Sequence, residues 1–179
     1  MNTADLTIIL GSPASGKTTL AQRLSSDLNL PYLCKDDVKE ALLDVLGAGD
    51  RDWSRRLSEA SFAALARLAR AQLAAGCSCI IEGNWRAAHA PILRAVLADH
   101  GARAAQICCR AEPREIVRRF TSRARHPGHL DGLLAGGELD AAAQAQPLFL
   151  DLGGPHWVYC SDSPTAYAEL LPRLKSWHM

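Results

Sequence analysis

The stretch ILGSPASGKTTLAQRL, residues 9–24, places two glycines, a lysine and two threonines between a run of β-forming residues and a run of helix-forming residues. Gly11 and Gly16 can adopt backbone angles closed to other residues, so consecutive N–H groups can turn inward around an anion. Lys17 adds a full positive charge, and the helix that begins there directs its N-terminal partial charge at the same place. The pattern Gly11-x-x-x-x-Gly16-Lys17-Thr18 therefore predicts a phosphate-binding loop, with the Thr18 hydroxyl placed to ligate Mg²⁺.

The alternative is a glycine-containing turn that binds nothing. The flanking sequence favours the phosphate interpretation, because LTIIL before the turn is typical of a short buried strand and KTTLAQRLSSDL after it of an amphipathic helix. We therefore predict that a nucleotide contacts the whole loop and the start of the helix: Gly11, Ser12, Pro13, Ala14, Ser15, Gly16, Lys17, Thr18 and Thr19.

Length and charge limit the class of protein. A chain of 179 residues is long enough for one domain with a substantial core and short for two. Its 20 lysines and arginines nearly balance its 19 aspartates and glutamates, so the field around the whole protein is weak. This balance argues against a protein whose affinity depends on a large nucleic-acid footprint. We expect a single domain over residues 1–179.

The N-terminal residues and the cysteines favour a cytoplasmic protein. The start MNTADLTIIL lacks a basic region, its apolar run is too short for a signal peptide, and no stretch approaches the length of a membrane span. The cysteines show no zinc-site spacing and mostly fall in predicted strands. We expect core thiols rather than metal ligands or disulfides. The six cysteines lie at positions 34, 77, 79, 108, 109 and 160.

Strand-like and helix-like segments alternate along the chain. This alternation predicts an α/β fold with a five-stranded parallel sheet and helices on both faces, in which ligands gather beyond the carboxyl ends of the strands. In the longest helix a stripe formed by Trp53, Leu57, Ala60, Ala64 and Leu68 is expected to face the core. The expected strands are 6–11, 31–34, 77–83, 102–110 and 156–161, and the expected helices are 17–28, 36–46, 53–75, 87–99, 113–124 and 164–176.

Acidic residues follow two of the expected strands. Asp36 and Asp37 stand where a helix should begin, so one of them is expected to cap that helix. The other could accept a proton from an attacking hydroxyl, as general bases do in phosphoryl transfer. Glu82 and Asn84 end a mostly apolar strand, where an acid beside a phosphate-binding loop can hold magnesium or orient a substrate. A solvated strand-end glutamate is the alternative.

Arginines accumulate before the least regular part of the chain, residues 125–138. Arg114 and Arg118 can serve solubility alone, whereas Arg119, Arg123 and Arg125 lead directly into that segment, RHPGHLDGLLAGGE. A long loop in a compact domain is usually functional or disordered, and we expect a lid over about 120–138 rather than a disordered spacer. An arginine delivered by such a lid would stabilise the charge on a migrating phosphoryl group. Two lid histidines, at 126 and 129, are expected to be incidental.

Four pieces of the chain, GSPASGKTT, KDDVKEAL, IIEGN and VRRFTSRA, resemble in sequence and order the P-loop kinase family that includes polynucleotide 5′-hydroxyl kinases, zeta-type toxin kinases and chloramphenicol phosphotransferase-like enzymes. The resemblance covers about two thirds of the chain and implies a P-loop NTPase fold with ATP and Mg²⁺ as cofactors. It implies that Asp36 is the catalytic aspartate, that Lys17 and Thr18 bind the nucleotide, and that Arg123 is the lid arginine that contacts the transferred phosphate. Lys39 stands where polynucleotide kinases carry an arginine that grips an acceptor phosphate.

These inferences predict a phosphotransferase that moves the γ-phosphate of ATP to an alcohol group. The acceptor is expected to be a small molecule, because a polynucleotide kinase would need a basic channel and stacking aromatics, for which Trp85 is the one obvious candidate near the site. The alternatives are a polynucleotide 5′-hydroxyl kinase and a nucleotide-dependent switch or ATPase without an acceptor. The predicted catalytic residues are Lys17, Asp36 and Arg123. Besides the loop, the predicted nucleotide contacts are Arg119 and Arg123, and the predicted metal contacts are Thr18 and Glu82. The predicted acceptor contacts are Asp36, Asp37, Lys39, Glu82, Asn84 and Trp85.

Overall fold

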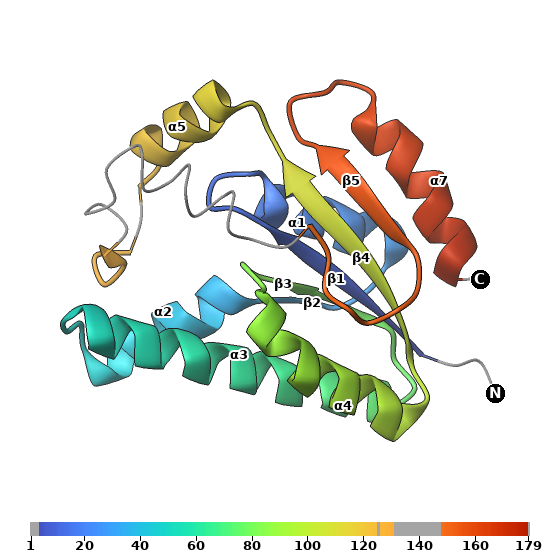
Figure 1. Cartoon of the computed structure of the whole chain (residues 1–179), viewed down its shortest axis with the longest axis horizontal. Coiled ribbons are helices and arrows are strands. Elements are labelled where there is room, and N and C mark those ends of the chain that lie inside the picture. Colours follow the sequence, from blue (N-terminus) through green and yellow to red (C-terminus); the bar gives the residue numbers. More distant parts are fainter. Residues whose placement is uncertain (1–3, 125, 131–147, 179) are drawn as a thin grey trace.

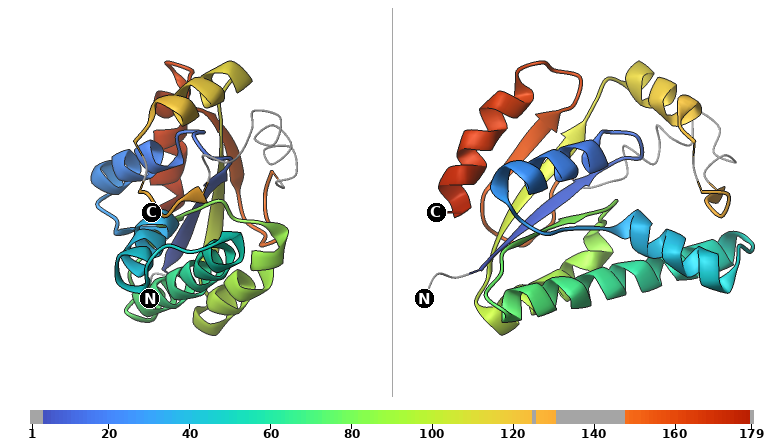
Figure 2. Two further views of the ribbon diagram at one scale, coloured as in Figure 1. Left: turned by 90° about the vertical axis from the view of Figure 1, so that its left-hand side faces the viewer. Right: turned by 180° about the vertical axis from the view of Figure 1, so that it is seen from behind.

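A parallel sheet with helices on both faces forms the centre of the molecule (Figure 1 and Figure 2). The computed structural model describes residues 4–124, 126–130 and 148–178. Five strands lie in the order β2-β3-β1-β4-β5, and each neighbouring pair is parallel. The predicted architecture is confirmed. The strands are β1 (Asp5–Gly11), β2 (Tyr32–Cys34), β3 (Cys79–Glu82), β4 (Arg103–Arg110) and β5 (His156–Cys160).

Helices connect the strands close to the predicted positions. The expected helix 87–99 begins with a 3₁₀ turn at Ala87–His89 and continues as an α-helix, because Pro91 fits the first turn, where its missing N–H is not needed. The other differences at helix ends amount to a few residues. The helices are α1 (Lys17–Leu28), α2 (Lys35–Leu46), α3 (Arg51–Ala74), α4 (Ala90–His100), α5 (Pro113–Ser122) and α7 (Ala166–His178).

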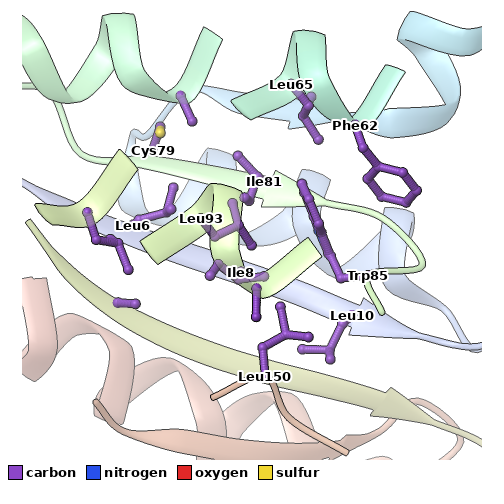
Figure 3. Packing of buried hydrophobic residues seen from close by; sticks show 14 of the residues in the cluster. Leu6, Ile8, Leu10, Phe62, Leu65, Cys79, Ile81, Trp85, Leu93 and Leu150 are labelled. Atoms are coloured by element: carbon purple, nitrogen blue, oxygen red, sulfur yellow. The ribbon is translucent and has the colours of Figure 1, made fainter. Parts of the chain in front are cut away.

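Alternation along β1 divides the core between the two faces of the sheet. Leu6, Ile8 and Leu10 point to the side covered by α3 and α4, where they pack with residues such as Leu65 and Leu93 (Figure 3). The intervening residues point to the other side, covered by α1 and α7, and there the cluster includes Ile9, Leu20, Leu24 and Leu170. A central strand buried on both faces explains why LTIIL is apolar at every position except Thr7.

The core-facing stripe of α3 differs from the predicted one. Leu57 is buried as expected, but Ala60 and Leu68 are exposed, and Trp53 and Ala64 are partly exposed. The helix packs against both the sheet and α4, and apolar residues lie on several of its sides, so its periodicity allowed more than one stripe. The buried residues of α3 are Leu57, Ser61, Phe62, Leu65, Ala66, Ala69 and Leu73.

The cysteines are all free thiols. Cys34, Cys79, Cys108 and Cys109 are buried, in agreement with the prediction, whereas Cys77 and Cys160 are exposed. Cys77 lies before the first residue of β3, and Cys160 ends the edge strand β5, so neither position is enclosed. Within the described residues, no helix combines the length and apolar character needed to cross a bilayer.

Gly11 ends β1 in a conformation that only glycine adopts readily, with φ +144°. A Cβ atom there would clash with the carbonyl oxygen of Cys109 on β4. We expect Gly11→Ala to lower the free energy of unfolding by about 2 kcal/mol, because backbone strain adds to the clash. Gly76 is a matched control, since it also has positive φ but no atom lies within 4 Å of the place that an added methyl group would occupy. Urea unfolding of Gly76→Ala should show the smaller loss, and equal losses would contradict the steric argument.

Candidate active site

The phosphate-binding loop between β1 and α1 is formed as the sequence predicts. Gly16 has φ +91° and immediately precedes Lys17, the first residue of α1, so the helix N-terminus faces the loop. Ala14 also has positive φ. Lys17 Nζ donates a hydrogen bond to the carbonyl oxygen of Ser12 at 2.8 Å. Ser15 Oγ is buried and has no hydrogen-bond partner among the described residues, which suits a loop that wraps an anion.

A cavity of about 400 Å³ opens beyond the carboxyl ends of β1, β2 and β3. Its wall brings together the loop, the first turns of α2, the end of β3 and the end of α5. Gly11, Ser12 and Ser15 lie behind this wall in the described structure, and the loop residues on its surface are Pro13, Ala14, Gly16, Lys17, Thr18 and Thr19. Beyond the loop, the predicted residues that line the cavity are Asp36, Lys39, Glu82, Asn84, Arg119 and Arg123.

Thr18 and Glu82, the predicted metal contacts, meet in one corner of the cavity. Thr18 Oγ1 donates to Glu82 Oε2 at 3.1 Å, and Lys17 Nζ lies 4.0 Å from Glu82 Oε1. Parallel pairing of β1 with β3 places Ile9 beside Glu82, so this acid is adjacent to the loop as predicted. One carboxylate and one hydroxyl suit Mg²⁺, which takes few protein ligands and shares the others with water and phosphate oxygens. The residues therefore fit this ion.

Cys34 supports the same carboxylate, a contact that the sequence analysis missed. Its thiol donates to Glu82 Oε2 at 3.1 Å, because β2 and β3 pair with Cys34 beside Glu82. Burial, followed by the charge of Glu82, raises the pKa of the Cys34 thiol well above its ordinary value. A raised thiol pKa keeps the proton on sulfur at neutral pH, so the hydrogen bond to Glu82 persists.

Asp36 lies at the cavity, and Asp37 does not. The Asp36 side chain is 42% exposed and pairs with Lys35 at 2.9 Å, whereas Asp37 is exposed outside the cavity wall. The expected capping role is wrong for both aspartates, because α2 begins one residue earlier than predicted and its N-cap is Cys34, with no side-chain cap. Both carboxylates instead lie in the first turn, where the helix dipole favours negative charge.

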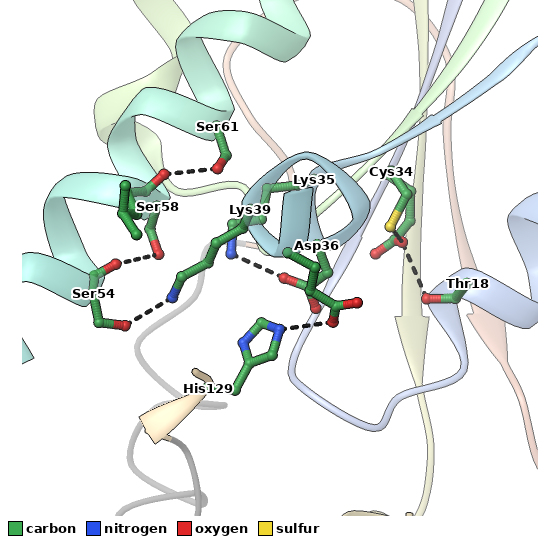
Figure 4. Close-up of polar contacts among 12 residues, drawn as sticks. Thr18, Cys34, Lys35, Asp36, Lys39, Ser54, Ser58, Ser61 and His129 are labelled. Carbon is green, nitrogen blue, oxygen red and sulfur yellow. Dashed lines mark hydrogen bonds and ion pairs between the residues drawn. The ribbon is translucent and has the colours of Figure 1, made fainter. Parts of the chain in front are cut away.

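Two lysines of α2 form the opposite side of the cavity, which we call the lysine corner: Lys35 and Lys39, with Ser54, Ser58 and His129 around them (Figure 4). Lys35 and Lys39 are each 5% exposed. Lys39 Nζ donates to Ser54 Oγ at 2.8 Å. Lys35 and Ser58 were not predicted from the sequence, although Lys35 and Lys39 stand four positions apart, the spacing of one helix face.

Arginines of α5 form the roof of the cavity. Arg119 donates to Glu115 Oε1 at 2.6 Å and to Ser161 Oγ at 2.7 Å, which fixes it beside Gly16. Hydrogen bonds from Arg118 and Arg119 lower the pKa of Glu115 to about 2. Arg118 also lines the cavity, although its sequence position allowed a role in solubility alone. Arg114 is exposed and lies outside the cavity wall.

Arg123 follows α5 and lines the same cavity as Asp36 and Glu82. Burial lowers the pKa of its guanidinium, while the negative charges of Asp36 and Glu82 raise it. Arg125, the third arginine of the predicted lid, lies outside the described residues.

The predicted lid lies mostly outside the described residues, but residues 126–130 are placed against α2. His126 Nε2 lies 3.0 Å from Asp44 Oδ1, and His129 Nε2 lies 2.8 Å from Glu40 Oε1. The His129 side chain is 3% exposed and lines the cavity. Of the two histidines, His129 is part of the cavity wall and His126 is not.

Trp85 does not face the cavity, and the prediction that it contacts the acceptor is wrong. Its side chain is completely buried, 4.8 Å from Phe62 between ring centroids, in the core beneath α3. The chain turns at Gly83, which leaves Asn84 on the cavity wall and directs the indole inward. The described cavity wall thus contains no tryptophan, tyrosine or phenylalanine.

Known proteins resemble this chain in sequence and in fold. Residues 6–133 match the AAA domain family AAA_33. A Chloroflexus aurantiacus J-10-fl protein described as a candidate kinase is 34% identical, with 98% of this chain and 96% of that chain covered and a TM-score of 0.83. No curated protein matches the chain.

Two more distant structures share the fold alone. A sugar kinase from Janibacter sp. HTCC2649 is 19% identical, with 97% and 94% of the two chains covered and a TM-score of 0.64. The APS kinase CysC of Mycobacterium tuberculosis, in complex with AMPPNP and APS, is 17% identical, with 98% and 99% covered and a TM-score of 0.56. The chain thus belongs to the AAA_33 family of AAA domains, and its fold is that of the small P-loop kinases.

Proposed function

We propose that the protein is an ATP-dependent kinase that transfers the γ-phosphate to a hydroxyl group of a small molecule. The observation that carries this proposal is the meeting of four elements in one cavity: the loop lysine Lys17, the Thr18–Glu82 pair, the carboxylate of Asp36 and the guanidinium of Arg123. Phosphoryl transfer needs positioning and charge stabilisation of this kind. Named kinases among the structural neighbours agree with it.

Each residue has a distinct role in the transfer. The acceptor hydroxyl oxygen forms a bond to the γ-phosphorus, the bond from that phosphorus to the bridging oxygen of ADP breaks, and the hydroxyl proton passes to Asp36. Lys17 binds the β- and γ-phosphate oxygens together with the loop N–H groups. Thr18 and Glu82 hold Mg²⁺, which neutralises phosphate charge when bound. Arg123 and Arg119 stabilise the charge on the migrating group and the nucleotide.

The cavity favours a small acceptor over a polynucleotide end. With Trp85 buried in the core, the described wall offers no tryptophan, tyrosine or phenylalanine ring on which a base could stack. The Asp36 carboxylate lines the cavity, where it can receive the proton of an acceptor hydroxyl. This position favours a kinase with an acceptor substrate over a switch or ATPase without one.

A transfer assay with γ-labelled ATP tests the proposal. The panel contains neutral polyols, hydroxy acids, sugar phosphates, nucleosides and a 5′-hydroxyl oligonucleotide at low and moderate salt. Labelling of a small molecule supports the proposal. Rapid labelling of the oligonucleotide that Lys39→Ala abolishes would replace it with a polynucleotide kinase, and acceptor-independent phosphate release would replace it with an ATPase.

We expect Arg123→Ala to lower the turnover rate by about 10²-fold while changing nucleotide affinity much less, because its charge is needed when the phosphoryl group moves. Arg114→Ala, which removes an exposed arginine near the start of α5, is the matched control and should leave both values unchanged. Steady-state kinetics and calorimetry with an ATP analogue separate the two effects. A loss confined to nucleotide affinity would assign Arg123 to binding only.

A further inference from the structure

One of the two carboxylate oxygens of Glu82 accepts two hydrogen bonds, and one of these comes from a residue that the transfer steps above do not use. Thr18 Oγ1 and Cys34 Sγ both donate to Oε2, each at 3.1 Å. The side chains of Thr18 and Cys34 lie beside each other at this point (Figure 4). The inference below rests on the proposed function, because it concerns how that site holds Mg²⁺.

The other oxygen of Glu82, Oε1, accepts no hydrogen bond within the described residues. It is the carboxylate oxygen nearer to Lys17, whose Nζ lies 4.0 Å away. Lys17 is placed to contact the β- and γ-phosphates, so Oε1 lies on the side where a metal–phosphate complex would bind. Two donors on Oε2 restrict rotation of the carboxylate and thereby keep Oε1 on that side.

Strand register brings Cys34 to this carboxylate. Cys34 ends β2 and is paired with Glu82, the last residue of β3, in a parallel register. Paired residues of adjacent strands project to the same face, and the strands lie about 4.8 Å apart, so a side chain as short as cysteine can reach its neighbour. The sheet backbone therefore fixes the position of the thiol.

Burial makes the thiol hard to replace with water. Cys34 is 5% exposed and Glu82 is 4% exposed, and a buried carboxylate that loses a donor is destabilised. Thr18 cannot provide the same anchor alone, because its hydroxyl oxygen is also the predicted ligand of Mg²⁺. Cys34 lies outside the described cavity wall, so it can hold Glu82 in the same orientation whether or not the ion is bound.

We propose that Cys34 is a positioning residue for Mg²⁺, and that its thiol holds Glu82 Oε2 so that Oε1 is the oxygen offered to the ion or to a water molecule on it. Cys34 acts through Glu82 and contacts neither the nucleotide nor the acceptor. Hydrogen-bond partners of this kind, which orient a metal ligand without touching the metal, commonly change metal affinity by about 10- to 100-fold when they are removed.

The Mg²⁺ dependence of nucleotide binding tests the inference. Calorimetry measures the Kd of a non-hydrolysable ATP analogue with Mg²⁺ and with EDTA, and the ratio of the two values is the Mg²⁺ enhancement. We expect Cys34→Ala to lower this enhancement by about tenfold while the Kd in EDTA stays unchanged. Cys34→Ser should retain most of it, because a hydroxyl is also a donor. Cys34→Val, which has no donor but fills the space of the thiol, replaces the alanine variant if that variant does not fold.

Two further variants separate positioning from a general loss of packing. Cys79→Ala removes a thiol that is 0% exposed, three residues before Glu82 on β3. It should lower the Tm and leave the Mg²⁺ enhancement unchanged. Glu82→Gln should itself lower the enhancement, and adding Cys34→Ala to it should lower it no further, because two residues that act through one contact are not additive.

Each outcome separates this inference from the proposed function. Wild-type enhancement in Cys34→Ala, equal losses with Mg²⁺ and with EDTA, or a second loss added to Glu82→Gln would overturn the role of Cys34 and leave the nucleotide assignment intact. Analogue binding to the wild type without any enhancement would refute the Thr18–Glu82 metal site, and the inference with it. If the wild type binds no analogue under either condition, the proposed function itself fails and the inference falls with it.

Discussion

Replacing Lys17 with alanine is expected to remove detectable nucleotide binding. Its ammonium group is the one full positive charge contributed by the phosphate-binding loop, and it lies 2.8 Å from the Ser12 carbonyl oxygen and 4.0 Å from Glu82. A lysine that contacts β- and γ-phosphates makes charge-assisted hydrogen bonds for which the loop N–H groups cannot substitute. Calorimetric titration with ATP and Mg²⁺ measures the effect.

The structure adds a second consequence to this substitution. Glu82 is 4% exposed, so removal of Lys17 leaves a buried carboxylate with less compensation. Lys17→Met, which keeps the apolar stem, serves as a second variant, and thermal unfolding shows whether either protein is folded. A folded variant that binds ATP as tightly as wild type would refute the nucleotide-binding assignment of the loop.

Asp36→Asn is expected to slow phosphoryl transfer by about 10²-fold or more while ATP still binds. The amide keeps the size of the side chain and an oxygen that can accept from Lys35, but it cannot take the hydroxyl proton. Because the side chain lines the cavity, the loss should appear in the chemical step. Single-turnover measurement with an accepted substrate isolates that step.

Asp37→Asn is the matched control for this prediction. It makes the same chemical change one residue along the first turn of α2, at an exposed side chain outside the cavity wall. Its transfer rate should stay close to that of wild type. A larger loss in Asp37→Asn than in Asp36→Asn would exchange the roles of the two aspartates.

Local sequence patterns were sufficient to predict the sheet. LTIIL is apolar at every position except Thr7 because β1 is buried on both faces, and the glycines after it mark the turn, so strand, loop and helix follow from about twenty residues. The stripe of α3 was not predictable in this way. Phe62 and Leu65 are buried while Leu68 is 46% exposed, and only the partners of the helix, which are distant in sequence, decide between them.

The positions of site residues were predictable where those residues lie at or directly after the carboxyl end of a strand. Asp36, Glu82 and Asn84 are examples, since parallel strands bring their carboxyl ends to one edge. Trp85 was not, because its direction depends on Phe62, a core residue of α3 whose ring centroid lies 4.8 Å from that of Trp85. A pattern confined to neighbouring positions contains no information about such a contact.

No residue separates β2 from α2, since the strand ends at Cys34 and the helix begins at Lys35. Cys34 is in register with Glu82, so hydrogen bonds of the sheet backbone set the spacing between Glu82 and Asp36. A single residue inserted between β2 and α2 would change the spacing between Asp36 and Glu82. Ser54 and Ser58 lie on α3, so they can be substituted without changing this spacing. We therefore expect selectivity to be redesigned most readily from α3, with the reaction geometry left untouched.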